Sequence, residues 1–184
     1  MTDVQNIPPA SPLVMVAAGG TGGHLFPAES LSAALAKRGI GTVLATDNRA
    51  AKFGDHFKSL HVVPSATLRG RDPISILRTA VTMTVGLGKA AMLMRKVRPS
   101  IVVGFGGYPS VPPVFMASIM KIPTLLHEQN AVMGRANRFL ASRVSAIATG
   151  FAGVTDKDKA LEIKTTCIGN PLRPAVIAAA DTPY

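Results

Sequence analysis

The segment Gly19–His24 reads GGTGGH and combines four glycines with one hydroxyl and one imidazole. Glycines let backbone N–H groups approach a ligand closely, and a helix that follows such a loop adds unpaired N–H groups and its positive dipole end. Phosphate oxygens or sugar hydroxyls are the natural ligands of this arrangement. A tight turn without a ligand is the alternative, but so many glycines exceed what a turn requires. We therefore expect a phosphorylated or glycosylated ligand here.

A dinucleotide site is a second hypothesis for the same loop. Gly20, Gly22 and the acidic Asp47 superficially suit it. The third glycine of the dinucleotide pattern, however, would fall at position 25, which is Leu25. An NAD(P)-dependent oxidoreductase is therefore the less favoured function.

A second glycine-rich segment contains Gly106, Gly107 and Tyr108 and precedes an expected helix. Its backbone can also face a ligand, and the tyrosine ring can stack on a sugar or form a hydrogen bond with it. A simple turn with a packed tyrosine explains the pattern equally well. The segment is a candidate sugar site with a structural alternative.

A third segment, His127–Asn130, reads HEQN and ends an apolar run with four hydrogen-bonding side chains. Their burial would be unfavourable unless they were paired, which favours a ligand site at the rim of the fold. For His127, a core imidazole with satisfied hydrogen bonds is the alternative. Farther on, Arg173 ends the segment Gly169–Arg173 and suits either bidentate phosphate contact or an ordinary surface position.

Metal binding is not expected. The four histidines show no metal-ligand spacing, and paired carboxylates are absent from the sequence. The single cysteine, Cys167, excludes a disulfide framework and favours a reducing cytoplasm. It lies in an apolar stretch, so we expect a packed structural thiol.

These loops need a scaffold, and the alternation of short apolar runs with helical patterns predicts an α/β fold with a parallel sheet and helices on both faces. Ligands of such sheets bind beyond the carboxyl ends of the strands, so the three loops should share one rim. We expect strands at 13–18, 41–46, 60–63, 101–105, 124–127, 144–148 and around 163–168. We expect helices at 27–38, 73–97, 109–121 and 133–142, with Pro27 in a first turn and a surface loop at 153–159.

The formal net charge of +10 points to anionic partners: nucleic acid, an acidic membrane surface or phosphorylated substrates. Nucleic acid would favour aromatic residues interleaved with basic ones, or a recognisable binding motif, and neither is found. We therefore expect no nucleic-acid partner. Residues 1–12 lack the pattern of a secretory signal and are expected to form a flexible N-terminus.

The segment Leu68–Arg98 holds seven basic residues and one acid among many apolar side chains. One face of a helix cannot bury all of the apolar residues, so an exposed apolar patch ringed by cations could dock on an anionic membrane. A core helix with solvated basic residues is an equally good alternative. Arg78 and Lys89 argue against a membrane span, and no segment of the sequence reaches the roughly 20 uncharged apolar residues that a span needs.

Five motifs occur in one order along nearly the whole chain and together resemble the MurG family of bacterial UDP-N-acetylglucosamine transferases. They are GGTGGHLFP at 19–27, LRG at 68–70, GGY at 106–108, HEQN at 127–130 and GNPLR at 169–173. The resemblance implies a Rossmann-like parallel sheet flanked by helices, the N-terminal domain of a GT-B glycosyltransferase, over residues 13–184. It also implies that the C-terminal donor domain is absent and that the chain alone is inactive.

The activity implied by the resemblance is a hexosyltransferase reaction of peptidoglycan synthesis, a process tied to cell shape and division. GlcNAc passes with inversion from UDP-GlcNAc to the MurNAc 4-hydroxyl of undecaprenyl-pyrophosphoryl-MurNAc-pentapeptide (lipid I), forming lipid II. The implied enzyme needs no cofactor or metal and lies peripherally on an anionic membrane surface, the cytoplasmic face of the inner membrane. The alternative is a non-catalytic, membrane-docked module that binds the acceptor.

Site residues carry over by motif position. His24 is a candidate general base, with a loop-orienting role as its alternative and Glu128 as the competing base. The implied substrate-binding residues are Thr21, Gly22, Gly23, Asn130 and Arg173. The candidate acceptor-binding residues are Gly106, Gly107 and Tyr108.

Overall fold

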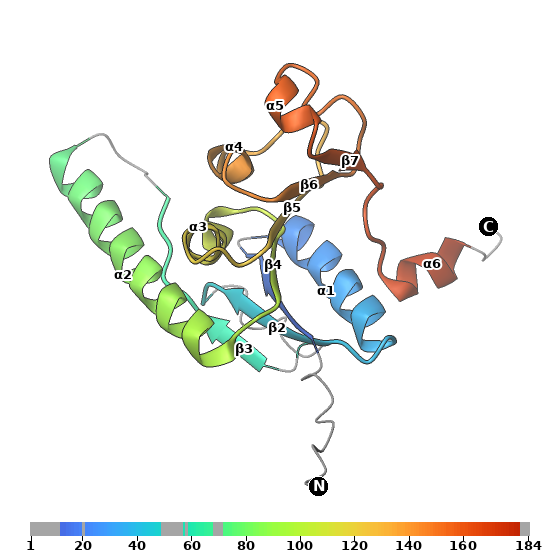
Figure 1. Cartoon of the computed structure of the whole chain (residues 1–184), viewed down its shortest axis with the longest axis horizontal. Helices are drawn as coiled ribbons and strands as arrows, with labels where there is room; N and C mark the ends of the chain where they lie inside the picture. Colours follow the sequence, from blue (N-terminus) through green and yellow to red (C-terminus); the bar gives the residue numbers. More distant parts are fainter. Residues whose placement is uncertain (1–11, 20, 49–56, 58, 68–71, 181–184) are drawn as a thin grey trace, which may run out of the picture.

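The computed structural model describes residues 12–19, 21–48, 57, 59–67 and 72–180. They contain a seven-stranded sheet of order β3-β2-β1-β4-β5-β6-β7, in which every adjacent pair is parallel (Figure 1). The strands are β1 (Leu13–Ala17), β2 (Gly41–Thr46), β3 (Ser59–Val62), β4 (Ile101–Gly104), β5 (Thr124–Glu128), β6 (Ala146–Thr149) and β7 (Thr165–Cys167). The predicted parallel α/β sheet is confirmed.

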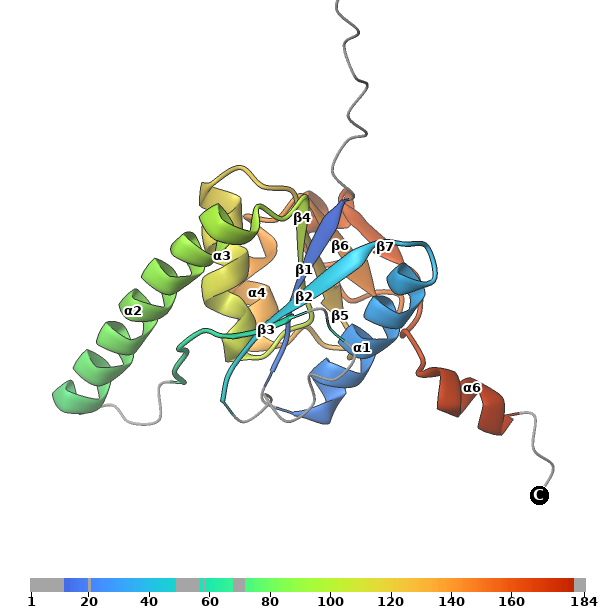
Figure 2. The same cartoon turned by 90° about the horizontal axis from the view of Figure 1, so that it is seen from below.

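Helices cover both faces of this sheet, as expected (Figures 1 and 2). One face carries α1 (Gly22–Ala36), and the other carries α2 (Pro73–Val97), α3 (Val111–Ile119) and α4 (Arg135–Ala141). The short elements are the 3-10 turn η2 (Tyr108–Ser110), α5 (Lys159–Glu162) and α6 (Pro174–Ala180). In both views α6 extends away from the sheet on the side of α1.

Two hydrophobic cores follow from the alternation of side chains along the strands. Val14 and Val16 of β1 pack with α1, whereas Met15 and Ala17 pack with α2, α3 and α4. All four side chains are buried, because a parallel strand between two helical layers has no solvated face.

The first helix begins earlier than expected, which corrects the placement of Pro27. Thr21 takes the extended N-cap conformation, and its carbonyl accepts hydrogen bonds from the amides of His24 and Leu25 at 3.2 and 3.3 Å. The second half of the glycine loop therefore forms the first helical turn. Pro27 lies inside the helix and cannot donate to the carbonyl of Gly23.

Other predictions also need correction. Cys167 is exposed rather than packed, because β7 is an edge strand of the described sheet. The expected helix at 109–121 is divided into η2 and α3. Two short helices were not expected from the sequence. One is α5, whose N-cap Asp158 accepts hydrogen bonds from Ala160 and Leu161, and the other is α6. The expected flexible N-terminus, apart from residue 12, and the LRG motif at 68–70 lie outside the described residues.

Candidate functional site

The strand order reverses between β1 and β4, and this switch point defines the site. The chain runs outward from β1 to β2 and β3, then returns to place β4 on the other side of β1. Ligands of doubly wound sheets bind at such a point, beyond the carboxyl ends of the strands. Here the glycine loop follows β1 and the Gly106-Gly107 segment follows β4.

The two loops touch through glycine backbones. Gly107 has φ 74° and ψ 155°, a conformation open essentially to glycine alone. A Cβ atom at Gly107 would lie 2.6 Å from the carbonyl oxygen of Gly19. Gly106 also has a positive φ, of 91°, and a Cβ there would lie 3.2 Å from the ring of His24. Glycine at both positions is therefore needed for the loops to approach each other.

The ring of His24 lies between the Gly106-Gly107 backbone and the HEQN segment. Its Nδ1 is 3.3 Å from Oε1 of Gln129, 105 residues away in sequence. The ring also lines a cavity of about 300 Å³, together with Tyr108, Glu128 and neighbouring backbone. The structure thus brings His24, the second loop and the HEQN segment together, as the shared-rim argument predicted.

Glu128 is buried at the end of β5, and both of its carboxylate oxygens accept hydrogen bonds. Oε1 accepts from the backbone and side-chain amides of Asn130 at 3.0 and 2.9 Å. Oε2 accepts from the backbone of Gly134 and the side chain of Asn137, each at 2.9 Å. Glu128 therefore fixes the turn that presents Asn130, whose own side chain is exposed.

His127 is the satisfied core imidazole that the sequence analysis held as the alternative. It is 2% exposed and its ring packs near Phe105. Nε2 is 3.1 Å from the carbonyl oxygen of Gly169, and Nδ1 is 3.1 Å from Nε2 of Gln129. Burial lowers the pKa of His127, against the opposing effects of the Gly169 hydrogen bond and the Glu128 charge. The ring is thus favoured in its neutral form.

The GNPLR segment joins the rim through two contacts. Asn170 donates a hydrogen bond to the carbonyl of Gln129 at 3.1 Å. The guanidinium of Arg173 stacks on the ring of Phe26, 3.9 Å from its centroid. A Cβ at Gly22 would lie 2.8 Å from that same ring, so Arg173 is held near the start of α1. Arg173 and the helix N-terminus together make this corner positive.

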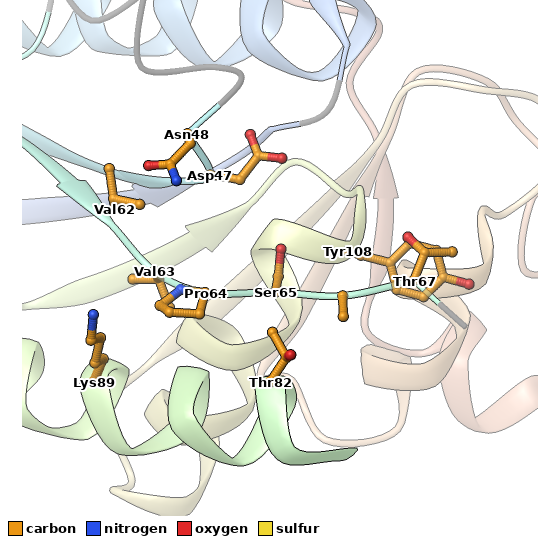
Figure 3. A pocket seen from close by; sticks show the side chains of 11 residues that line it. Asp47, Asn48, Val62, Val63, Pro64, Ser65, Thr67, Thr82, Lys89 and Tyr108 are labelled. Carbon is orange, nitrogen blue, oxygen red and sulfur yellow. The ribbon is translucent and has the colours of Figure 1, made fainter. Parts of the chain in front are cut away.

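A larger cavity, of about 650 Å³, shares Tyr108 with the smaller one. Figure 3 shows the side chains that line the larger cavity. Asp47 and Asn48 line it after β2, Thr82 and Lys89 line it from α2, and residues 63–67, which follow β3, line it as well. Tyr108 lines both cavities and so marks their border. Among the described residues, no group of three or more His, Cys, Asp or Glu side chains is arranged to hold a metal.

Residues 14–149 match the model of the glycosyltransferase family 28 N-terminal domain. The chain belongs to this family. It is 53% identical, over 95% of its length, to a UDP-N-acetylglucosamine–N-acetylmuramyl-(pentapeptide) pyrophosphoryl-undecaprenol N-acetylglucosamine transferase of Rhodopseudomonas palustris BisA53. A transferase of the same name from Bradyrhizobium sp. ORS 278 is 51% identical over 95% of the chain. The match covers 47% and 48% of these relatives, so the chain spans about half their length.

Solved structures agree on the fold. The crystal structure of Acinetobacter baumannii MurG superposes with a TM-score of 0.68 at 23% identity, over 95% of this chain and 50% of that one. The UDP-GlcNAc 2-epimerase of Methanocaldococcus jannaschii gives 0.61 at 16% identity, over 86% and 45%. The family 28 domain described here is thus the N-terminal Rossmann-like domain of a GT-B fold, as expected, and its family is not one of oxidoreductases.

The surface of this family 28 domain includes an apolar face on α2. Ile74, Leu77, Val81 and Met92 are 79%, 65%, 55% and 70% exposed, and the helix buries Gly86, Ala90 and Met94. The exposed patch expected from the sequence is confirmed. By length and composition α2 could also cross a membrane, contrary to the argument from its charges. However, it connects β3 and β4 of one sheet and packs on α3, which favours lying along a surface.

Two side chains at this rim make contacts that were not expected from the sequence. Gln129 was grouped with its polar neighbours, although its side chain contacts the rings of both His24 and His127. Phe26 carried no expected role and proves to be the platform for Arg173. Only the aromatic residue in the GGTGGHLFP motif hinted at the second contact, because its partner lies 147 positions away.

Proposed function

We propose that this domain is the acceptor-side half of an inverting transferase that passes GlcNAc from UDP-GlcNAc to the MurNAc 4-hydroxyl of lipid I, forming lipid II. The names of the relatives at 51–53% identity support this activity. The observation that carries it is the placement of His24 on a cavity beside the positive N-terminus of α1. A base and an anion site thus lie within one rim.

His24 acts as the general base in this proposal. As the MurNAc hydroxyl attacks the anomeric carbon of the donor, His24 takes the hydroxyl proton and UDP leaves with the bonding electron pair. Glu128 suits this role less well, because four donors already surround its buried carboxylate. Glu128 instead holds Asn130 toward the substrates.

The negative charge of the substrates is met at the start of α1. Among the described residues no acceptor pairs with the backbone N–H groups of Gly22 and Gly23, which lie at the helix N-terminus. Thr21 precedes them with an exposed hydroxyl, and Arg173 is held nearby on Phe26. These groups would bind a diphosphate of the donor or of the acceptor.

The acceptor would lie along the Gly106, Gly107 and Tyr108 side of the rim. From Tyr108 the larger cavity runs to Thr82 and Lys89 of α2, and the exposed apolar face of α2 continues along that helix. A diphosphate-linked lipid fits this spatial arrangement, in which the polar rim is followed by the cation Lys89 and then by the apolar face of α2. The domain would then lie peripherally on the cytoplasmic face of the inner membrane, held by anionic lipid.

A chimera tests the activity: this chain replaces the N-terminal half of the R. palustris relative, and transfer of labelled GlcNAc to a lipid I analogue is measured. We expect transfer by the chimera, and a loss of roughly 10²–10⁴-fold in His24→Gln. His61→Gln, on β3 and not among the residues that line the His24 cavity, is the control and should remain active. A folded chimera that binds UDP-GlcNAc without transferring the sugar would contradict the proposal. A fully active His24→Gln variant would show that His24 is not the general base.

The second candidate is an acceptor-binding module that is not catalytic by itself. It is favoured by the observation that the chain spans only about half the length of its relatives. The chain alone should then bind a lipid I analogue without transferring GlcNAc to it. Transfer by the isolated chain would refute this candidate.

A further inference from the structure

The side-chain amide of Gln129 has only one orientation that its surroundings allow. Its Nε2 lies 3.0 Å from the backbone carbonyl oxygen of His127, and a carbonyl can only accept a hydrogen bond. The amide NH₂ must therefore face that carbonyl, and Oε1 must point the other way. The side chain is 9% exposed, so the amide is held inside the protein.

The ring of His127 has a defined tautomer for the same reason. Its Nε2 lies 3.1 Å from the carbonyl oxygen of Gly169, so Nε2 carries the proton. Nδ1 of the neutral ring is then bare and accepts from the Gln129 NH₂ at 3.1 Å. The lowered pKa of His127, caused by burial, agrees with a neutral ring. Both bonds require the same orientation of the glutamine amide.

The proton on His24 follows from that orientation. Oε1 of Gln129 is an acceptor, so Nδ1 of His24, 3.3 Å away, must be the donor. In the neutral ring Nε2 is then unprotonated, and within the described part of the chain no group hydrogen-bonds to it. The ring borders the small cavity, where Tyr108, Glu128 and Arg135 are the other titratable or charged groups.

We propose that Gln129 is a positioning residue that fixes His24 in the tautomer with a bare Nε2, through a hydrogen-bonded chain ending on the Gly169 backbone. This inference rests on the proposed role of His24 as base, because only a bare Nε2 can take the proton of the acceptor hydroxyl. A reversed amide would face the carbonyl and the bare Nδ1 of His127 with its own oxygen, and both of those hydrogen bonds would be lost. The chain also links the base to the segment that carries Arg173.

The tautomer is measured directly by ¹⁵N NMR of the isolated chain, at a pH well above the ordinary imidazole pKa. We expect the His24 signals, assigned with a His24→Gln sample, to show a protonated Nδ1 and a bare Nε2. In Gln129→Met, which is similar in shape but has no acceptor, the Nδ1–H form should lose its predominance. His61, bonded to Ser59, is the internal control and should not change. A wild-type His24 protonated on Nε2 would overturn the proposal, even if Gln129→Met failed to fold.

The catalytic consequence is measured in the chimera. Gln129→Met should lower kcat about fivefold, the effect of losing one neutral hydrogen bond, with little change in KM. A purely structural role would leave the tautomer unchanged and lower the amount of folded enzyme instead. An unchanged kcat would refute the positioning role. If the wild-type chimera is inactive while NMR shows the bare Nε2, the proposed function fails and the tautomer assignment stands.

Discussion

Replacing Gly107 by alanine should destabilise the domain in two ways, through backbone strain and through a steric clash. With φ 74° and ψ 155°, an alanine there is strained by about 1–3 kcal/mol. Its Cβ would also lie 2.6 Å from the carbonyl oxygen of Gly19, so the glycine loop must move. We expect a total destabilisation of about 3 kcal/mol, or a fall in Tm of roughly 6–12 °C for a domain of this size.

Gly39→Ala is the matched control. Gly39 has φ 72°, but a Cβ there would have no atom within 4 Å. Only the strain of about 1–2 kcal/mol remains, so Tm should fall by roughly 2–8 °C. Thermal unfolding of both variants measures the difference, and an amide NMR spectrum of Gly107→Ala should show shifts in the glycine loop. Equal destabilisation with an unmoved loop would refute the argument that the two loops are in contact.

Three further outcomes are expected. Glu128→Gln should destabilise the domain by about 2–3 kcal/mol in urea unfolding, because an NH₂ group replaces an oxygen that accepts two hydrogen bonds. Because burial lowers the pKa of His127, the unfolded chain binds that proton first, and the free energy of unfolding should fall as pH drops below 6.5. Urea unfolding at about pH 7.5 and about pH 5.5 measures this decrease in the free energy of unfolding. In His127→Gln the decrease should be smaller but still present, because the pKa of His61 is also lowered. Leu77→Glu should weaken co-sedimentation with anionic vesicles, whereas Ile163→Glu, at the exposed end of α5, should not. Binding to neutral vesicles as strong as to anionic ones would contradict the electrostatic part.

Local sequence signals were enough to place much of the fold. The helix expected at 73–97 agrees with the observed bounds of α2. The structure shows why it begins and ends there: the Asp72 side chain caps its start, Pro73 fits its first turn and Arg98 ends it in a left-handed conformation. The shared rim followed from the parallel topology alone. The start of α1 was placed wrongly because the sequence analysis assigned Pro27 to a first turn, whereas the glycines before it enter the helix themselves.

Long-range partners were the part that sequence could not supply. Whether His127 is a ligand residue or a core imidazole depends on the Gly169 carbonyl, 42 residues away. The orientation of the Gln129 amide depends in turn on that ring. By contrast, the bonds of Glu128 to Asn130 and Gly134 are local in sequence, and the run of donors after an acidic residue could have indicated them.

The network around His24 bears on how the proposed reaction is organised. Among the described residues, two groups flank the ring: Gln129 on one side and the Gly106-Gly107 backbone on the other. In the proposed reaction, a base held in this way would be oriented before any donor sugar arrives. The contribution left to a donor-binding half would then be to bring the anomeric carbon to a hydroxyl already facing Nε2. Variants of Gln129 should accordingly change kcat rather than donor affinity, which separates this network from any residue that binds UDP-GlcNAc.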